Sequence, residues 1–436
     1  MSTNLQIGIV GLPNVGKSTL FNAITKAGAE AANFPFCTIE PNVGVVEVPD
    51  HRIYDLAKMF QPKKTTPAFT RFVDIAGLVA GASKGEGLGN QFLSHIRETD
   101  AIAHVVRCFE DGNITHVEGS IDPVRDMDII NTELCLADLE SVDKKKVKTA
   151  KLAQAGIKQA KLDLPVLEKV FDALQEGTPA RALDLSEDDL EVLKELNLIT
   201  LKPVLYVLNV AEDDIADPEA NPFVQKAAAQ AEKEGAKWVP ISAEIEQEVS
   251  ELDAEEAKAF LADLGEEEPG LNRLIRSAYS MLGLINFFTV GPDECRSWTV
   301  RAGTKAPKAA GKIHSDIERG FIRAEIVSYK DLMECGSYTT SSAKRSPTGV
   351  EGKDYMHPGS GIIAYFPLQC VVFANQRAHA RMGCGFFVPS LMGKGGLSHR
   401  FPLSVGKRCP EGAEVGFRSG VKENVREAVF SYFRLY

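Results

Sequence analysis

Residues 11–18 have the types and spacing of a phosphate-binding loop. They read Gly-Leu-Pro-Asn-Val-Gly-Lys-Ser, the pattern G-x-x-x-x-G-K-S, between an apolar run and a helical pattern. Gly11 and Gly16 let backbone N–H groups approach a β-phosphate, and the helix N-terminus adds a favourable dipole. Lys17 reaches the β- and γ-phosphates, and Ser18 ligates Mg²⁺. The sequence therefore predicts a nucleoside triphosphate site with a cradle formed by Asn14, Val15, Gly16, Lys17, Ser18 and Thr19.

A second motif supplies the rest of the phosphate end. Asp74 begins a D-x-x-G pattern at the end of an apolar run, which places its carboxylate near Mg²⁺ and the N–H of Gly77 on the γ-phosphate. Between the two motifs, Thr38 occupies the position of a residue that completes the Mg²⁺ shell, although a simple turn role is the alternative. We therefore expect Ser18, Thr38 and Asp74 to hold the metal.

The base-reading segment departs from the guanine pattern. Guanine-specific relatives of this fold carry Asn-Lys-x-Asp, whose Asp accepts hydrogen bonds from N1–H and the 2-amino group of guanine. Here the segment 209–212 reads Asn-Val-Ala-Glu. Adenine has no 2-amino group, and Asn209 can still bond its N6 or N7. The sequence predicts ATP over GTP, with relaxed discrimination, and a base site formed by Asn209, Val210, Glu212 and the backbone-contacting Ser242.

The hydrolytic group is also unusual. Switch GTPases place a Gln after D-x-x-G to orient the attacking water, whereas this chain has Leu78, which can neither donate nor accept. Slow intrinsic turnover is expected. Two polar groups could compensate: Asn14 could hold K⁺ between the phosphates, and His116 could swing in from its loop. For a single loop histidine, a surface role is the alternative.

Alternating strands and helices must position these motifs. Such alternation predicts an α/β fold with a mostly parallel sheet covered by helices on both faces, and ligands bind at the carboxyl ends of its strands. The expected strands are Leu5–Val10, Gly44–Val48, Arg71–Ile75, Ala101–Cys108, Pro203–Val210 and Lys237–Ile241. The expected helices are Ser18–Ala27, Arg52–Phe60, Gly89–Glu98 and Pro222–Glu234.

A helical insertion interrupts this alternation at about 127–199. Its apolar stripe predicts an antiparallel hairpin, with the break between helices marked by Gly156 and by residues 163–165. Asp143 is the only acid from 141 to 161. Lysines dominate this stretch: Lys144, Lys145, Lys146, Lys148, Lys151, Lys158 and Lys161. A solvated helix face and a contact with the RNA phosphate backbone both explain such a cluster.

The C-terminal third has another character. An acidic stretch, 244–268, precedes a helical pattern near Leu271–Leu282 and a small β-rich module whose strands are expected at 287–290, 297–300, 321–328 and 361–366. Residues 372–436 are basic, with little periodicity.

Composition narrows the functional classes. The 436 residues suggest about three domains, and the net charge of −11 argues against a surface that binds nucleic acid throughout. Eight cysteines without C-x-x-C pairs indicate reduced thiols rather than disulfides or a zinc site. No signal peptide and no membrane-spanning run are expected. A cytoplasmic protein is the resulting prediction.

The motifs together resemble the YchF family of Obg-related ATPases. The resemblance covers about 4–370 and is carried by residues 11–18, 33–42, 74–79, 209–212 and 306–316. It implies an Obg-type P-loop domain over 4–278, with a coiled-coil insertion at 127–199, and a TGS domain of β-grasp fold over 279–370. It also implies Mg²⁺-dependent ATP hydrolysis, a hydrophobic residue at Leu78, a catalytic role for His116, a monomer, and ribosome association in translation and stress responses.

The match to this family ends before the chain does. Residues 371–436 have no counterpart in the pattern, so read-through or frame-shifted sequence is expected there, with a functional basic extension as the alternative. Other functions remain open from the residues: an Obg-type GTPase, or a nucleotide-sensing RNA-binding module with little turnover. RNA contact could come from the basic face of the coiled coil or from the TGS domain.

Overall fold

The computed structural model describes residues 5–27, 42–75, 88–112, 119–336, 349–351 and 362–365; side chains are not described at 88–91, 325, 335, 349–351 and 362–365. The residues of three predictions, Thr38, Leu78 and His116, lie outside these ranges, as do Gly77 and the tail from 366 onward.

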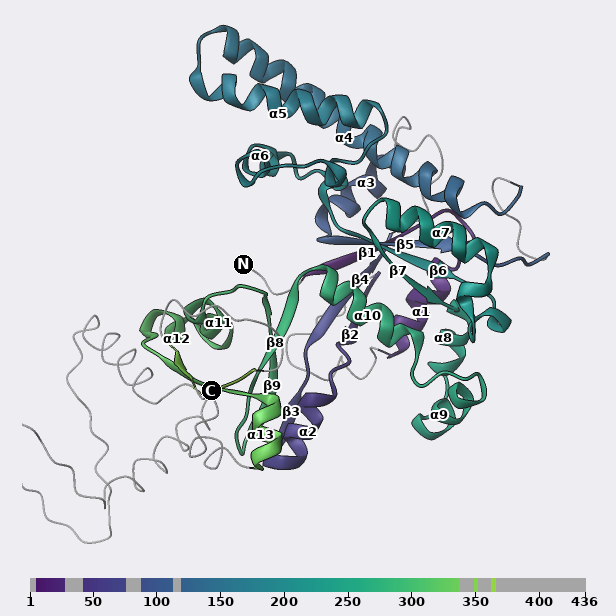
Figure 1. Cartoon of the computed structure of the whole chain (residues 1–436), viewed down its shortest axis with the longest axis vertical. Helices are drawn as coiled ribbons and strands as arrows, with labels where there is room; N and C mark the ends of the chain where they lie inside the picture. Colours follow the sequence, from purple (N-terminus) through teal and green to yellow (C-terminus); the bar gives the residue numbers. More distant parts are fainter. Residues whose placement is uncertain are drawn as a thin grey trace, which may run out of the picture. The chain divides into compact units, whose positions relative to one another are not determined.

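The first sheet carries the predicted motifs at the ends of its strands (Figure 1). Its order is β2-β4-β1-β5-β6-β7, parallel except for β2 against β4. Every residue of the central strands β5 and β6 is buried, as expected for strands covered on both faces. The strands are β1 Gln6–Val10, β2 Val43–Glu47, β4 Phe69–Asp74, β5 Ala101–Arg107, β6 Val204–Asn209 and β7 Lys237–Ile241. The predicted α/β fold is confirmed.

Helices cover both faces of this sheet. Figure 1 shows α3, α4 and α7 on one side and α1, α8 and α10 on the other. Their bounds are α1 Lys17–Ala27, α3 Leu88–Glu98, α4 Pro123–Gln154, α7 Pro222–Lys233, α8 Ala243–Val249 and α10 Gly270–Met281. The acidic stretch, for which the sequence analysis named no element, forms α8 and α9 Ala254–Asp263. A capping box between Asp253 and Glu256 starts α9.

The insertion folds as a helical hairpin of α4 and α5, Lys158–Gln175 (Figure 1). The break falls at Gly156, whose φ of +91° favours glycine. The expected second marker is wrong, because Pro165 lies inside α5. The arms bury a core of their own, with α6 Glu187–Leu193 nearby. This core consists of Cys135, Val142, Leu167, Val170, Leu174, Ala180, Leu193 and Leu198.

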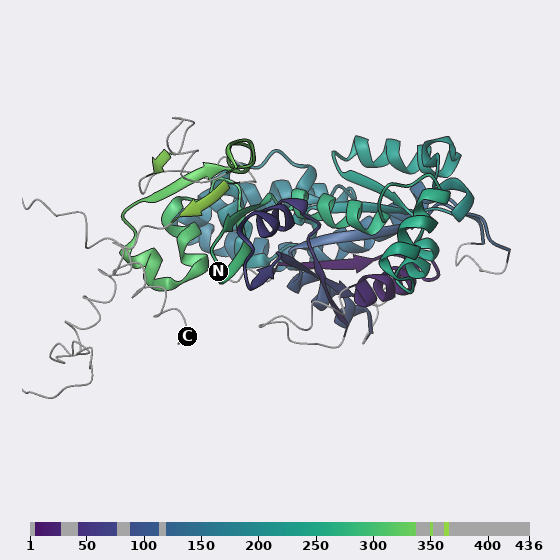
Figure 2. The same cartoon turned by 90° about the horizontal axis from the view of Figure 1, so that it is seen from below.

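The second sheet has the order β11-β10-β12-β8-β9-β3, with β8 and β12 parallel. Its strands are β8 Leu284–Thr289, β9 Glu294–Arg301, β10 Ala324–Ser328, β11 Gly349–Glu351, β12 Ile362–Tyr365 and β3 Lys64–Thr66. Three helices accompany them: α11 Ala306–Ile313, α12 Ser315–Gly320 and α13 Tyr329–Cys335. Figure 2 gives the same elements from below. The central parallel pair is consistent with the β-grasp expectation.

One edge of the second sheet comes from far upstream in the sequence. Strand β3 pairs with β9, and α2, His51–Phe60, buries Ile53 and Leu56 against Phe288 and Val327. Tyr329 Oη also donates to Asp55 Oδ2 at 2.7 Å. Residues 51–66 therefore pack with the second sheet although they fall within the sequence range of the first. Their helical and polar pattern carried no sign of this partner.

Candidate nucleotide site

The loop after β1 is shaped by two glycines that have no room for a side chain. A Cβ on Gly11 would lie 2.5 Å from the carbonyl oxygen of Val105, and one on Gly16 would lie 2.3 Å from Asn209 Nδ2. Gly16 has φ +98° and Asn14 has φ +61°, a region that Asn tolerates better than most residues. The loop thus turns tightly against the ends of β5 and β6 and leads directly into α1.

Lys17 is the buried cation of this loop. Its side chain is 7% exposed, and its Nζ donates to the carbonyl of Leu12 at 2.5 Å. Burial lowers its pKa to about 8, and the nearby carboxylate of Asp74 offsets part of that effect. An ammonium held this way has one backbone acceptor and two further N–H groups to offer an anion. The predicted phosphate-binding role fits this placement.

Asp74 closes β4 beside the loop. Its N–H donates to the carbonyl of Asn42 at 2.9 Å. Burial raises the pKa of its carboxyl, and the charge of Lys17 lowers it in part. Ser18 is exposed in the first turn of α1. A hydroxyl and a carboxylate are hard oxygen ligands, the type that Mg²⁺ prefers, so this donor set fits the predicted metal.

Beyond the loop lies a cavity of about 690 Å³ on the base side. Its lining comes from the loops after β1, β5 and β6, from α1, and from α8 and the residues after it: Asn14, Gly16, Thr19, Phe109, Glu110, Asp111, Asn209, Val210, Ala211, Ala243, Glu244, Gln247, Glu248 and Glu251. The structure thus brings the predicted loop and the segment 209–211 together at the carboxyl edge of the sheet. Glu212 is exposed and is not among the lining residues.

Asn209 makes two hydrogen bonds within the site. Its Nδ2 donates to the carbonyl of Val15 at 2.9 Å, and its Oδ1 accepts from the N–H of Ala243 at 2.9 Å. It therefore ties the phosphate loop to the start of α8. One N–H and one lone pair of the amide remain, so Asn209 can still bond N6 or N7 of a base. Ser242, also predicted, has a buried Oγ that makes no hydrogen bond to the described residues.

Two family models match separate parts of the chain. The one described as a 50S ribosome-binding GTPase matches residues 6–133, and the one described as YchF-GTPase_C, a protein of unknown function, matches 284–366. The "Ribosome-binding ATPase YchF" of Bacillus subtilis is 52% identical over 83% of this chain and 98% of that protein. The protein of the same name from Escherichia coli O157:H7 is 52% identical over 80% of this chain and 95% of its own.

A solved structure, that of the Schizosaccharomyces pombe YchF GTPase, superposes with a TM-score of 0.76 at 41% identity. It covers 84% of this chain and 98% of that one. The chain belongs to the YchF family. The resemblance inferred from the motifs is thereby confirmed, and so is the P-loop fold with its C-terminal module.

Phe109 is among the YchF cavity residues that the motifs did not predict. Phe109 follows the carboxyl end of β5, and the guanidinium of Arg107 stacks 4.5 Å from its ring centroid. Arg107 is 1% exposed and also donates to the carbonyl of Phe109 at 3.1 Å. The available signal was position, because the residues that follow a buried parallel strand line the ligand edge.

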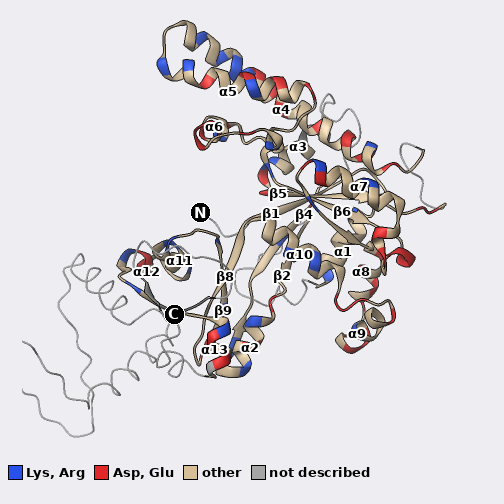
Figure 3. Ribbon diagram, in the orientation of Figure 1, with Lys and Arg blue, Asp and Glu red and all other residues tan. Residues whose placement is uncertain are grey.

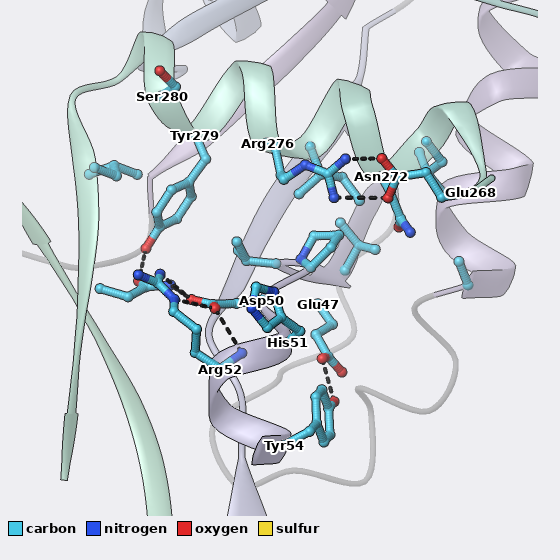
Figure 4. A pocket seen from close by; sticks show the side chains of 18 of the residues that line it. Glu47, Asp50, His51, Arg52, Tyr54, Glu268, Asn272, Arg276, Tyr279 and Ser280 are labelled. Atoms are coloured by element: carbon cyan, nitrogen blue, oxygen red, sulfur yellow. Dashed lines mark hydrogen bonds and ion pairs between the residues drawn. The ribbon is translucent and has the colours of Figure 1, made fainter. Parts of the chain in front are cut away.

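A second cavity, of about 940 Å³, opens where the two sheets meet (Figure 4). At its floor Asp50 accepts two hydrogen bonds from the guanidinium of Arg52, at 2.7 and 2.6 Å, and one from Asn286 Nδ2 at 3.3 Å. Tyr279 donates to Asn286, and it lies 2.7 Å from the hydroxyl of Thr299. This network fastens α2 to α10 and the second sheet.

Neither a His, Cys or carboxylate metal cluster nor a membrane-spanning helix is present among the described residues. Within the described ranges, no group of three or more His, Cys, Asp or Glu side chains could hold a metal ion. Among the described helices, none combines the length and apolar character needed to cross a bilayer.

Proposed function

We propose that this chain is an ATPase switch that binds the ribosome and hydrolyses ATP slowly. The observation that carries the proposal is the buried Lys17 beside Asp74 at the end of a parallel strand, in a chain whose relatives are named ribosome-binding ATPases. Cytoplasmic location, monomeric state and action in translation and stress responses remain part of this proposal. Co-sedimentation of the purified protein with ribosomal subunits, with and without ATP, tests the binding half.

ATP preference over GTP follows from the base side. Val210 lines the cavity where guanine-binding relatives have Lys, and Glu212 is exposed outside the lining. No carboxylate of this segment is therefore placed to accept from N1–H and the 2-amino group of guanine. Equilibrium titration with ATP and GTP in the presence of Mg²⁺ should give tighter ATP binding.

A double variant sharpens this test. Val210→Lys with Glu212→Asp restores the guanine pattern and should shift the preference toward GTP, because a short carboxylate then reaches the base edge. Val210→Lys with Glu212→Ala is the matched control and should not, because it lacks the carboxylate. Tighter GTP binding by the unchanged chain would contradict the proposal and favour a conventional Obg-type GTPase.

Mg²⁺ would be held by Ser18, Thr38 and Asp74, and it supplies neutralisation of the phosphate charge. Asn14 would hold a K⁺ ion in the same region. Burial raises the pKa of Asp74, so a cation beside it would stabilise the carboxylate form that ligates the metal. Removal of Mg²⁺ with a chelator should abolish turnover, and Asp74→Asn should raise the Mg²⁺ concentration that turnover needs.

We attribute the expected slow hydrolysis to Leu78, which stands where switch GTPases have a catalytic Gln. Leu78 cannot orient a water, so His116 is the proposed polar group that acts on it. His116→Ala should lower turnover and leave ATP affinity unchanged, whereas a surface histidine would change neither. Leu78→Gln reports independently on whether this position limits the rate.

RNA contact is proposed for the basic hairpin or for the second module. On the hairpin, Lys144 binds Glu140 at 2.6 Å, Lys145 binds Glu195 at 2.7 Å, and Lys146 lies 2.9 Å from the ring centroid of Phe171. Three of the seven lysines are thus engaged within the insertion. The remaining four gather at its far end, and this reduces the charge that the stem could offer RNA.

A further inference from the structure

The tip of the helical hairpin carries the same five-residue pattern on both arms. Residues 148–152 read Lys-Thr-Ala-Lys-Leu, and residues 158–162 read Lys-Gln-Ala-Lys-Leu. Each copy lies on one helix, α4 or α5, with the turn at Gly156 between them. Positions i, i+3 and i+4 share a helix face, so each arm presents two lysines and one leucine together. We call residues 147–162 the hairpin tip.

The side chains of the hairpin-tip lysines are unpaired within the described part of the chain. The ammonium groups of Lys148, Lys151, Lys158 and Lys161 are exposed and make no hydrogen bond or ion pair to any described residue. No acid occurs from 144 to 162. The charge of Lys148 helps to lower the pKa of Glu195, but that carboxylate is already bound by Lys145. Figure 3 shows Lys and Arg colour on both arms toward this end of the hairpin.

At the hairpin tip, small side chains are buried and large apolar side chains are exposed, the reverse of the usual arrangement. Small residues, Thr149 and Ala160, are buried between the arms at 4% exposure. The larger ones face outward: Leu162 is 68% exposed, Ile157 46% and Leu152 39%. With Val147, they account for four of the nine large hydrophobic side chains exposed in the described part of the chain. A solvated helix end gains nothing from this arrangement, whereas a contact surface does.

We propose that the hairpin tip docks onto a protein surface that has an apolar groove rimmed by carboxylates. The aliphatic side chains would fill the groove and the four lysines would meet the rim, as amphipathic helices do in groove complexes. A phosphate backbone would use the lysines but leave the leucines in water, and unstacked bases prefer aromatic or Arg platforms, which the tip lacks. Since this inference rests on the proposed ribosome binding, the groove belongs to a ribosomal protein.

Paired variants measure the apolar part. Leu152→Ser with Leu162→Ser should weaken binding to purified ribosomal subunits about 20-fold, because two partly exposed leucines lose their burial. The matched control is Leu190→Ser with Leu252→Ser, two leucines that are exposed elsewhere at 44% and 37%. It should bind like the unchanged protein. ATP hydrolysis by the free protein should be the same in all three.

Charge variants, together with binding to protein-free RNA, distinguish a protein partner from an RNA partner. Lys151→Gln with Lys161→Gln should also weaken subunit binding, and the control Lys226→Gln with Lys258→Gln should not. Ribosomal RNA extracted from the same subunits should bind unchanged protein and leucine variant equally weakly. Equal binding of subunits by the leucine variant, or RNA binding as tight as subunit binding, would overturn the inference in favour of phosphate contacts.

A cross-link identifies the partner directly. A benzophenone amino acid in place of Ile157, irradiated on the subunits, should give an adduct that protease removes and ribonuclease does not. An adduct with the reverse sensitivity overturns the inference but leaves ribosome binding intact. If the unchanged protein does not bind subunits at all, the proposed ribosome function fails, and this inference fails with it.

Discussion

The nucleotide cradle and the hairpin tip both rely on lysines, but they hold them in opposite ways. Lys17 is buried and bound to the carbonyl of Leu12, and burial lowers its pKa to about 8. The lysines of the tip are exposed and have no bonded partner among the described residues. A buried cation depends on each neighbouring atom, whereas exposed charges act almost independently. Single substitutions should therefore have large effects in the cradle and small ones at the tip.

The largest expected effect is at Lys17. Lys17→Met should weaken ATP binding at least about 100-fold, because two or more charge-assisted bonds to phosphate are lost. Folding should not suffer, since the buried charge is costly and Met fills a similar volume. ATP titration and urea unfolding measure the two effects. The exposed Lys226→Met is the control, and comparable losses in both variants would refute the contrast.

Asn209 comes next, because it joins two parts of the cradle. Asn209→Ala removes the bonds to Val15 and Ala243 and leaves both backbone groups buried without them. The free energy of unfolding should fall by about 2–3 kcal/mol, and ATP should bind more weakly. Asn209→Asp keeps the acceptor for Ala243 and should recover part of the stability. Full stability of the Ala variant in urea would mean that this bridge is not structural.

The contrast between buried and exposed groups also predicts a pH dependence. His104 lies in β5 against Tyr206, with ring centroids 5.2 Å apart, and burial lowers its pKa to about 3, helped by the charges of Arg181 and Lys17. Below its unfolded pKa of about 6.5, only the unfolded chain takes up the proton, so stability falls as pH falls. Between pH 7 and pH 5 the loss should be about 2 kcal/mol.

The control variant for His104 is His104→Phe, and the quantity to compare is the slope of the unfolding free energy against pH. His104→Phe can change the unfolding free energy at pH 7 through altered packing, but it removes the titrating group. Its unfolding free energy should therefore vary less with pH than that of the unchanged chain over the same range. Parallel curves would show that His104 is not the group responsible.

How far the sequence predicts these regions depends on what fixes each one. The phosphate loop is dictated by local backbone, since only glycine fits at positions 11 and 16, and a motif records such a requirement. The dual bonding of Asn209 involves Val15 and Ala243, distant in sequence, so no local pattern could reveal it. Likewise β3 joins the second sheet through β9, which is over 200 residues away in the chain.

Pro165 and the hairpin lysines are two further cases in which tertiary contacts decide what the local sequence does not show. A proline usually signals a helix boundary, but the contacts between the arms keep α5 continuous through it. The run of lysines in the sequence does not show which of them are paired, and Lys144, Lys145 and Lys146 form ion pairs on the stem. Which charges stay unpaired is decided by tertiary neighbours, and these the sequence pattern does not contain.

Asp50 is a carboxylate whose burial lies between that of Lys17 and that of the hairpin-tip lysines, so its substitution should have an intermediate effect. Burial favours a raised pKa, but hydrogen bonding to Arg52, the charge of Arg52 and the bond from Asn286 hold the pKa of Asp50 below its usual value. Its stabilisation should therefore be present above about pH 4 and be lost as pH falls through the lowered pKa. Asp50→Ala should cost about 1–2 kcal/mol at pH 7 through the lost cap and network.

The reference for Asp50 is the exposed cap Ser186, which accepts from the N–H of Asp189 at 3.2 Å. Ser186→Ala removes a helix cap without a buried network and should cost less than Asp50→Ala. Equal losses in thermal unfolding would mean that Asp50 acts only as a cap and that the bonds to Asn286 add nothing between the two sheets.

The smallest effect belongs to the hairpin tip itself. Lys151→Gln with Lys161→Gln should change the free energy of unfolding by less than about 0.5 kcal/mol, because neither ammonium is bonded to a described residue. It should rise if anything, since like charges on one helix end repel. Added salt should reduce that small gain by screening the repulsion in the unchanged chain. A loss above 1 kcal/mol would show that these lysines contribute to the fold. The expected contrast in stability between cradle and tip substitutions would then be wrong.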